Sequence, residues 1–484
     1  MKAKNKSLKL NAILNTIRQS LTILFPLITF PYASRVLGTD EFGRYTFSAS
    51  VVTYFQLFAT FGISTFAIRE GAAIRNDRKA ISGLASDLFS FNIITCSIAY
   101  VALFLLVKFN PKIHSYEGLM CIQSTCMILT MLGLDWVNNV YEDFLYITIR
   151  YIIIQIIALI CIFMFIHSST DTTKYCLILV GGSYGGNLLN LLYIRRYIDL
   201  PKPNKFPIKK YISPLSILFV NSLATTIYVN SDVTMIGIFL NDSEVGLYSF
   251  ASKIYNLLKY FINAAVIVTI PRLAAVVNED QKEYNSLIQI ALNTLLIFLL
   301  PVAAGLFMLS KQIVIVAGGE EYIGGYSSLM VLSFSLVFAL LASICTNCIL
   351  IIHKLEKRIL TSTIISAAIN VLLNLILIPS IGIVGAAITT VGAELVNLII
   401  QAYFIKKDVN VLIVVKGKDI TSIIIGVAEV VAICYLSNYF WIDLTFTNSI
   451  KQIVICVILS GGVYLVTLLC FKNSALLSFI RKKK

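Results

Sequence analysis

The stretch "TDEFGRYTFSAS" at residues 39–50 returns as "DSEVGLYSFASK" at residues 242–253. An offset of 203 residues aligns the two copies without a gap and carries the match through the following apolar segment to its polar exit. The identical pairs are Leu37/Leu240, Glu41/Glu244, Gly43/Gly246, Tyr45/Tyr248, Phe47/Phe250, Phe58/Phe261, Arg69/Arg272 and Ala72/Ala275. Chance similarity between two helix ends is the alternative, but an internal repeat of this kind is typical of duplicated membrane bundles.

The composition is that of an integral membrane protein. Of the 484 residues, 58% are hydrophobic and 13% are charged, and the mean hydropathy is +0.84; soluble domains carry roughly 25% charged residues. Apolar runs of about 20 residues recur along the whole chain, and each is long enough to cross a hydrocarbon core of roughly 30 Å. Short alternating strands are absent from the pattern, so we expect an all-α polytopic protein and not a barrel.

The apolar runs predict about 14 transmembrane helices, with ends uncertain by a few residues. The predicted spans are 12–36, 44–66, 84–107, 117–137, 144–166, 174–194, 211–240, 246–270, 286–309, 323–352, 358–378, 383–405, 419–440 and 449–471.

The net charge is +14, and its distribution along the chain is typical of a membrane protein. Most Lys and Arg residues fall in alternate connections, so the positive-inside rule places both termini in the cytoplasm and nucleic acid is not an expected partner. One connection departs from the rule, because "NNVYEDF" at 138–144 should be cytoplasmic yet carries two acids and no base. The hydrophilic segment "RRYIDLPKPNKFPIKK" at 195–210 is expected to be an extended cytoplasmic linker.

The repeat and the linker together predict the domain organisation. Because six is an even number, a second six-helix copy enters the membrane in the same direction as the first, which gives parallel repeats around a central cavity. The quoted phrase itself is interpreted as a helix-capping turn, with its glycine ending the turn and its acid at the next helix N-terminus. The predicted parts are an N-terminal lobe at 1–200, the basic linker at 201–210, a C-terminal lobe at 211–406, and two further helices with a basic tail at 407–484.

Polar side chains inside the predicted spans are candidates for function, because a buried charge in a bilayer is costly and faces either water or a partner. They are Arg18, Asp87, Asn92, Arg150, Asp232, Lys253, Lys259, Glu394 and Glu429. The four bases Arg18, Arg150, Lys253 and Lys259 predict a binding interior for an anion such as a diphosphate. For Asp87 and Arg150, a position at the cytoplasmic edge of the membrane is an equally good interpretation.

Asp232 and Lys253 lie on opposite sides of the turn at 240–245, so antiparallel helices would place them at similar depth. Either they form a structural salt bridge, or they form a charge pair that opens when a ligand or a coupling cation arrives. We therefore expect Asp232, with Asp87 and Glu394, to act in coupling or gating.

Cysteine and histidine do not indicate a metal or cofactor site. The ten cysteines lie inside predicted spans and the three histidines are scattered at span ends. The close pair in "CTNC" at 345–348 has no acidic or histidine partner within its span, so metal binding is not expected. No cofactor is predicted, apart from a coupling ion that would be Na⁺ or H⁺.

Five phrases resemble, in their order along the chain, the Wzx-type flippases of polysaccharide, O-antigen and teichoic-acid repeat units, in the multidrug/oligosaccharidyl-lipid/polysaccharide exporter superfamily. They are "LFPLITFPYASRVLGTDEFGRYTFSAS" (24–50), "GLDWVNNVYEDFLYITIR" (133–150), "NSDVTMIGIFLNDSEVGLYSFASKI" (230–254), "AGGEEY" (317–322) and "LILIPSIGIVGAAITTVGAELV" (375–396). The helix-ending Pro271 falls in the matching place.

The resemblance implies two six-helix lobes plus two helices that open alternately to either face of a bacterial cytoplasmic membrane. The cargo would be an undecaprenyl-diphosphate-linked oligosaccharide, and a polysaccharide polymerase and glycosyltransferases would be partners besides the membrane lipids. Arg18, Arg150 and Lys253 would meet the diphosphate or sugar acids, while Asp232 and Asp87 would tune the coupling.

Two other functions are weighed against this one. A multidrug or metabolite cation antiporter of the same superfamily would share the fold but favour acidic side chains in its cavity, whereas here the bases predominate. A polytopic glycosyltransferase or polysaccharide polymerase would need acids or bases on sizeable outer loops. The predicted outer connections are short, so the chain is not expected to be an enzyme, and a passive channel is disfavoured because no filter motif appears.

Overall fold

A computed structural model describes residues 8–203, 208–267, 269–409, 411, 417–441 and 443–481. Within these ranges the regular structure is helical, without strands, which confirms the predicted all-α class. The chain divides into two compact units, Met1–Asn230 and Ser231–Lys484. The predicted two six-helix lobes, their boundaries and a cavity between them stay predictions, and residues 204–207 of the predicted linker lie outside the described ranges.

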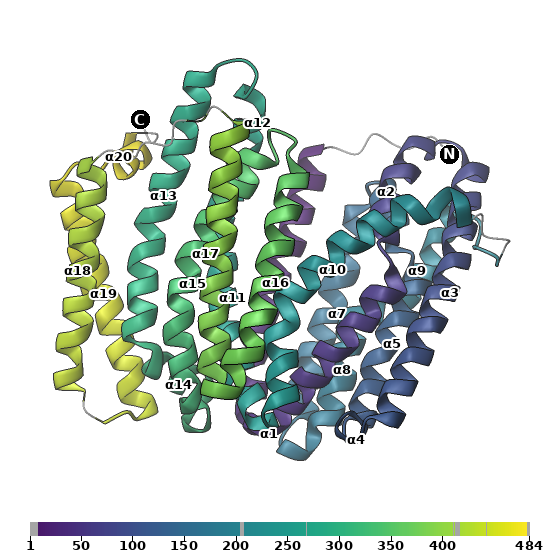
Figure 1. Cartoon of the computed structure of the whole chain (residues 1–484), viewed down its shortest axis with the longest axis horizontal. Coiled ribbons are helices and arrows are strands. Elements are labelled where there is room, and N and C mark those ends of the chain that lie inside the picture. Colours follow the sequence, from purple (N-terminus) through teal and green to yellow (C-terminus); the bar gives the residue numbers. More distant parts are fainter. Residues whose placement is uncertain are drawn as a thin grey trace. The chain divides into compact units, whose positions relative to one another are not determined.

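The first unit is built from ten α-helices and two short 3₁₀ turns among its described residues (Figure 1). They are α1 Leu8–Thr60, α2 Ile63–Ile74, α3 Arg78–Phe109, α4 Pro111–His114, α5 Glu117–Gly133, α6 Asp135–Val140, α7 Phe144–Phe165, η1 Ser169–Asp171, α8 Thr172–Tyr184, α9 Gly186–Tyr193, η2 Ile194–Arg196, and most of α10 Ile208–Phe239.

The second unit continues from the end of α10. Its described helices are α11 Asp242–Ile267, α12 Ile270–Val276, α13 Gln281–Met308, α14 Ser310–Gly318, η3 Glu320–Gly325, α15 Tyr326–Ile344, the π-helical turn η4 Cys345–Leu350, α16 Glu356–Ile381, α17 Ile383–Asp408, α18 Gly417–Phe440, α19 Phe446–Cys470 and α20 Ser474–Arg481. Helices α18 and α19 run side by side in Figure 1 and contact each other along their lengths.

A helix break precedes each copy of the opening phrase, and the two breaks are made by different means. The predicted turn within the phrase is wrong, because its glycines Gly43 and Gly246 lie inside α1 and α11. In the first copy the chain turns at Gly38, whose φ of 76° and ψ of 175° interrupt the helix that otherwise runs through α1. That backbone region is accessible essentially to glycine alone. In the second copy Asn241 stands at the aligned position, and its side-chain oxygen accepts a hydrogen bond of 2.9 Å from the backbone N–H of Glu244. Asn241 is thus the N-cap of α11.

Buried aromatic residues of the phrase anchor each copy to its own bundle. Phe47 and Phe250 are both fully buried. The Phe47 ring packs edge-on against Tyr116 just before α5, with ring centroids 4.9 Å apart. The Phe250 ring packs on Tyr322 just before α15, with ring centroids 4.4 Å apart. The conserved spacing within the repeat therefore places the same contact at corresponding places in both units, which supports duplication over chance similarity.

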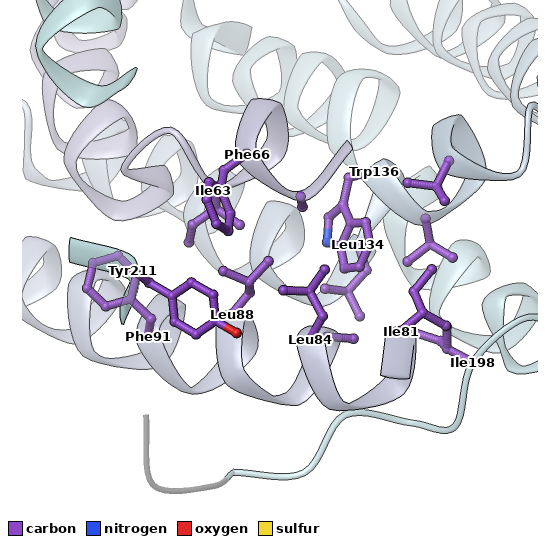
Figure 2. Packing of buried hydrophobic residues seen from close by; sticks show 14 of the residues in the cluster. Ile63, Phe66, Ile81, Leu84, Leu88, Phe91, Leu134, Trp136, Ile198 and Tyr211 are labelled. Atoms are coloured by element: carbon purple, nitrogen blue, oxygen red, sulfur yellow. The ribbon is translucent and has the colours of Figure 1, made fainter. Parts of the chain in front are cut away.

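The core of the first unit lies around one end of α3. Figure 2 shows side chains from α2, α3 and α10 converging with Trp136 of α6. Trp136 is 3% exposed, and a Cβ atom on Gly71 of α2 would lie only 3.3 Å from its ring. Glycine at position 71 therefore lets α2 approach α6 closely, and this packing holds the short α6 segment in place.

Eleven of the described helices are long and apolar enough to cross a membrane. One of these segments, Thr16–Ile74, is 59 residues long and includes the turn at Gly38. Two predicted spans are not among the eleven: α5, which has 17 residues, and α11. The polytopic character is confirmed, while the number of about 14 spans stays a prediction. The predicted span 117–137 differs in detail, because Leu134 adopts a left-handed φ of 45° and separates α5 from α6.

Candidate functional site

An arginine–carboxylate pair stands at the break between α5 and α6. The left-handed Leu134 ends α5 and places Asp135 in the first turn of α6, opposite Arg150 in the second turn of α7. Nη2 of Arg150 lies 2.8 Å from Oδ1 of Asp135, and the Arg150 side chain is 9% exposed whereas that of Asp135 is 44% exposed. The other terminal nitrogen of Arg150, Nη1, is buried and makes no hydrogen bond.

Two neighbours fix the position of Arg150. Its guanidinium carbon lies 5.4 Å from the centre of the Tyr146 ring, within the range of a cation–π contact. A Cβ atom on Gly186 of α9 would lie 3.3 Å from both Cδ and Nε of Arg150. The glycine therefore leaves the room that the arginine stem occupies. The guanidinium is therefore positioned by the helix α7 and its neighbours, and not by a loop.

The acidic connection that departs from the charge pattern is neutralised locally. Glu142 forms an ion pair of 2.9 Å with Arg75, and Asp143 accepts hydrogen bonds from the hydroxyls of Tyr193 and Tyr197, at 2.7 and 2.6 Å. Burial and the neighbouring Asp143 raise the pKa of Tyr197 well above its usual range. Both acids of this connection therefore have partners within the first unit, and its cytoplasmic side stays a prediction.

Arg18 and Asp87 have different surroundings in the same unit. The hydroxyl of Thr148 in α7 donates to the carbonyl of Leu14 in α1 at 3.2 Å. Arg18 follows Leu14 by one turn and so lies on the face of α1 that meets α7, whereas Arg150 follows Thr148 by two residues, about 200° around α7, and meets α6 and α9 instead. Asp87 is half-buried on α3 and accepts a hydrogen bond of 3.1 Å from the hydroxyl of Tyr211.

In the second unit, Asp232 lies in a buried polar network. It is 8% exposed. Its Oδ2 accepts hydrogen bonds from the hydroxyls of Tyr248, at 2.6 Å, and of Thr390, and its Oδ1 accepts one of 2.7 Å from the amide of Asn374. Three side-chain donors from three helices thus converge on one carboxylate. The carboxylate is therefore the centre of a junction between α10, α11, α16 and α17.

The expected Asp232–Lys253 salt bridge is wrong for the described part of the chain. The described partners of Asp232 are the two hydroxyls and the amide, and Lys253 is not among them. Equal depth on adjacent helices does not determine which way side chains point, because each residue rotates about 100° around the axis. Lys253 lies on α11, half-buried, at the position that corresponds to Ser50 in the first copy.

Lys259 and Glu394, which the sequence analysis placed in different roles, form one ion pair. Nζ of Lys259 lies 2.8 Å from Oε1 of Glu394, and their side chains are 28% and 5% exposed. The ammonium also lies 5.6 Å from the centre of the Tyr255 ring. The pair joins α11 to α17 inside the second unit. The predicted substrate base and the predicted gating acid are therefore a single electrostatic element.

An apolar cavity of about 450 Å³ lies between α13 and the pair α18–α19. Its lining includes Phe298, Pro301, Val457, Gly461 and Leu465. Such a lining can accommodate hydrocarbon but offers few hydrogen-bond partners. The second unit thus contains an apolar compartment as well as charged ones.

Comparison with known proteins places the chain in a family. Residues 8–277, more than half of the chain, match the family model described as polysaccharide biosynthesis protein. The chain belongs to this family. The chain is 19% identical over 410 residues to the putative O-antigen transporter of Escherichia coli (strain K12), covering 84% of the chain and 99% of that relative.

Further relatives extend the comparison. The chain is also 27% identical over 195 residues to the probable low-salt glycan biosynthesis flippase Agl15 of Haloferax volcanii, covering 40% of the chain and 41% of that relative. Its fold is similar to the solved structure of lipid II flippase MurJ in an inward closed conformation, with a TM-score of 0.72 at 16% identity over 95% of this chain and 99% of that one. The resemblance found in the sequence is confirmed, as is the helical transporter fold.

The sequence analysis missed several residues that surround the predicted charges. Asp135 lies within the "GLDW" phrase and could have been found as the acid nearest to Arg150 in sequence. Among the donors to Asp232, Tyr248 lies in the repeated phrase, but nothing in the sequence links it to Asp232. Asn374 and Thr390 carry no comparable signal, because they are ordinary residues in apolar surroundings until the fold brings them together.

Proposed function

We propose that the protein translocates a polyprenyl-diphosphate-linked oligosaccharide from the cytoplasmic to the outer leaflet by alternating access, for surface polysaccharide biosynthesis. The proposed location is the bacterial cytoplasmic membrane with both termini in the cytoplasm. Family membership and the many apolar helices support a membrane transporter of this pathway. Relatives that carry the names of an O-antigen transporter and a glycan biosynthesis flippase support the same class of cargo.

The observation that carries the proposal is the buried guanidinium of Arg150. Inside a membrane protein an arginine with an unused, buried N–H is costly, and such a group is retained where it meets an anion. A fork of N–H donors matches the oxygens of a phosphate group. Arg18, which follows Leu14 on α1 by one turn, would add a second positive charge, and Lys253 would act on the cargo from α11.

Coupling would reside in the second unit. The Asp232 carboxylate has several oxygen-bearing neighbours and could exchange its hydroxyl donors for Na⁺ or take up H⁺. The Lys259–Glu394 pair would serve as a gate, because separating a largely buried pair requires each charge to find another partner. Asp87 would act more weakly, since it is half-buried and bonded to Tyr211.

The apolar cavity offers a place for the isoprenoid chain of the cargo. Its lining is almost wholly hydrocarbon, so a polar sugar would gain little there whereas a polyprenyl chain would exchange lipid contacts for protein contacts at small cost. Charge and apolar volume together suit an amphiphile with an anionic head.

A cation antiporter of the same superfamily is the second candidate, and the buried acids Asp232 and Glu394 are the observation that favours it. Both acids are already engaged by neutral donors or by Lys259, which favours the anion carrier. The relatives reported above are named as transporters or flippases, which supports a protein that is not an enzyme. A polymerase and glycosyltransferases would supply and consume the cargo.

The function can be tested by measuring the leaflet distribution of the lipid-linked unit. Depletion of the protein should accumulate this lipid on the cytoplasmic face and reduce surface polysaccharide. In vesicles containing the purified protein, a defined polyprenyl-diphosphate sugar donor should become accessible from the opposite face. An unchanged leaflet distribution with normal surface polysaccharide would refute the proposal.

A further inference from the structure

The Asp135–Arg150 pair is an incomplete one. An arginine presents five N–H donors in a planar fork, and a carboxylate that satisfies the fork binds with both oxygens. Here one hydrogen bond joins Nη2 to Oδ1 at 2.8 Å, while Nη1 is buried without a hydrogen bond. Half of the terminal donor pair is therefore unused although water does not reach it.

The two partners differ in how firmly they are held. Arg150 is 9% exposed and is confined between the Tyr146 ring and the space left by Gly186, whereas Asp135 is 44% exposed. Asp135 lies on a helix of six residues that follows the left-handed Leu134. The guanidinium is thus a fixed receptor, and the carboxylate is the partner that can turn away into water at little cost.

We propose that Asp135 is a resident counterion which occupies the Arg150 fork until a diphosphate displaces it. The incoming phosphate oxygens would bond both Nη2 and the unused Nη1, and Asp135 would turn towards solvent. This inference rests on the proposed function for the identity of the cargo. It adds a specificity residue, Asp135, that selects among anions.

The selection follows from charge and from chain connectivity. A sugar carboxylate has the same charge and geometry as Asp135, but Asp135 is tethered beside the fork at a high effective concentration, so a monocarboxylate competes poorly. A diphosphate carries more negative charge and offers oxygens to both terminal nitrogens. The pair would therefore reject free sugar acids and nucleate binding of the diphosphate group.

The test is anion binding by the purified full-length protein, measured by calorimetry with inorganic pyrophosphate. A Trp441→Phe background leaves Trp136, next to Asp135, as the reporter among the two tryptophans of the chain. Asp135→Asn keeps the side-chain shape and removes the competing charge, so it should bind pyrophosphate about tenfold more tightly than the parent protein. The Trp136 fluorescence should change over the same concentration range. Arg150→Ala should abolish binding.

Three further measurements sharpen the test. Glu142→Gln is the matched control, because Glu142 is about as exposed as Asp135 and also pairs with an arginine of the same unit, and it should leave the affinity unchanged. Arg150→Lys keeps the charge but not the fork, so it should retain the fold and bind pyrophosphate at least tenfold more weakly. Glucuronate should bind measurably to the Asp135→Asn variant and not to the parent.

Equal pyrophosphate affinity in the parent and in Asp135→Asn would overturn the inference, as would equal tightening in Glu142→Gln. Vesicles of phosphatidylglycerol, a phosphodiester, distinguish the lipid surface from the diphosphate: tightening for this lipid as large as for pyrophosphate would also overturn it. These outcomes can be told apart from failure of the proposed function. If Asp135→Asn binds pyrophosphate as the parent does while vesicles with the wild-type protein still translocate the lipid-linked donor, only the counterion role of Asp135 is contradicted.

Discussion

The two copies of the repeat join corresponding helices with chemically different pairs. In the first unit the amide of Gln56 donates to the hydroxyl of Tyr184 on α8, at 3.1 Å. In the second unit the aligned position is Lys259, which forms its ion pair of 2.8 Å with Glu394 on α17. A neutral hydrogen bond contributes about 1 kcal/mol and is insensitive to ions, whereas a largely buried ion pair costs several kcal/mol to break from one side.

The difference extends to Asp232, whose aligned position in the first copy is Thr29. Thr29 is buried and its hydroxyl donates to the carbonyl of Phe25, one turn earlier on the same helix. At this position the second unit therefore has a carboxylate that bonds to other helices, whereas the first unit has a hydroxyl that bonds within its own helix. We infer a division of labour in which the first unit supplies the anion-binding arginine and the second supplies groups whose charge responds to ions.

The largest effect is expected at Asp232. Asp232→Ala would remove the charged acceptor that Tyr248, Thr390 and Asn374 share, and a hydrogen bond to a charged group contributes about 1.5–3 kcal/mol. We expect little folded protein in membranes, measured by size-exclusion chromatography after detergent extraction. Asp232→Asn should fold but lose translocation and its dependence on Na⁺ or pH.

The control for Asp232 is Asp87→Asn, which removes a half-buried acid with one hydrogen bond, to Tyr211. It should leave the folded fraction close to wild type and weaken the ion dependence of transport far less than Asp232→Asn does. Full ion-dependent transport by Asp232→Asn would contradict the division of labour between the units.

The next effect is expected at the Lys259–Glu394 pair. Lys259→Ala strands a buried carboxylate and should lower the free energy of unfolding by about 3–5 kcal/mol, seen as a lower Tm. Replacing both partners, with Lys259→Gln and Glu394→Gln, imports the neutral chemistry of the first copy and should restore most of the Tm while translocation stays impaired. Normal translocation by the double variant would show that the charges are structural alone.

A smaller effect is expected in the apolar cavity. Gly461 and Gly462 both have open space where a Cβ would project, but Gly461 lines the cavity and Gly462 does not. Gly461→Trp should reduce translocation of long polyprenyl donors several-fold and spare short-chain donors, and Gly462→Trp should leave both unchanged. Equal inhibition by the two variants would remove the cavity from the transport path.

The smallest effect is expected at Asp199, which pairs with Arg78 where both side chains are at least half exposed. Asp199→Asn should lower the free energy of unfolding by less than about 1 kcal/mol, as is usual for exposed pairs. A Tm shift as large as that of Lys259→Ala would mean that exposure does not separate structural from functional pairs in this protein.

Much of the fold could be predicted because its signals are local. The repeated phrase places the buried Phe47 and Phe250, and both contact an aromatic residue that precedes a later helix. The break at Leu134 could not be predicted in the same way, because a left-handed leucine has no sequence signature comparable to glycine. The predicted single span there misses α6, which holds Asp135.

The candidate charges could be found from the sequence, but their partners could not. The positions of Arg150, Asp232 and Lys259 within apolar segments can be seen directly in the sequence. The pairing of Lys259 with Glu394 joins residues 135 positions apart, and the Asp232 junction joins four helices. The depth of a residue along its helix can be predicted by counting residues, whereas the direction in which its side chain points depends on how the helices pack.

The two solutions to the turn at positions 38 and 241 have an evolutionary consequence. At position 38 the backbone makes the turn with φ and ψ angles that only glycine readily adopts, so we expect no other residue to replace glycine there in homologues. At position 241 the turn depends on a capping side chain, and aspartate, serine or threonine would serve as well as asparagine. Among homologues we therefore expect the residue at position 38 to be invariant and the residue at position 241 to vary.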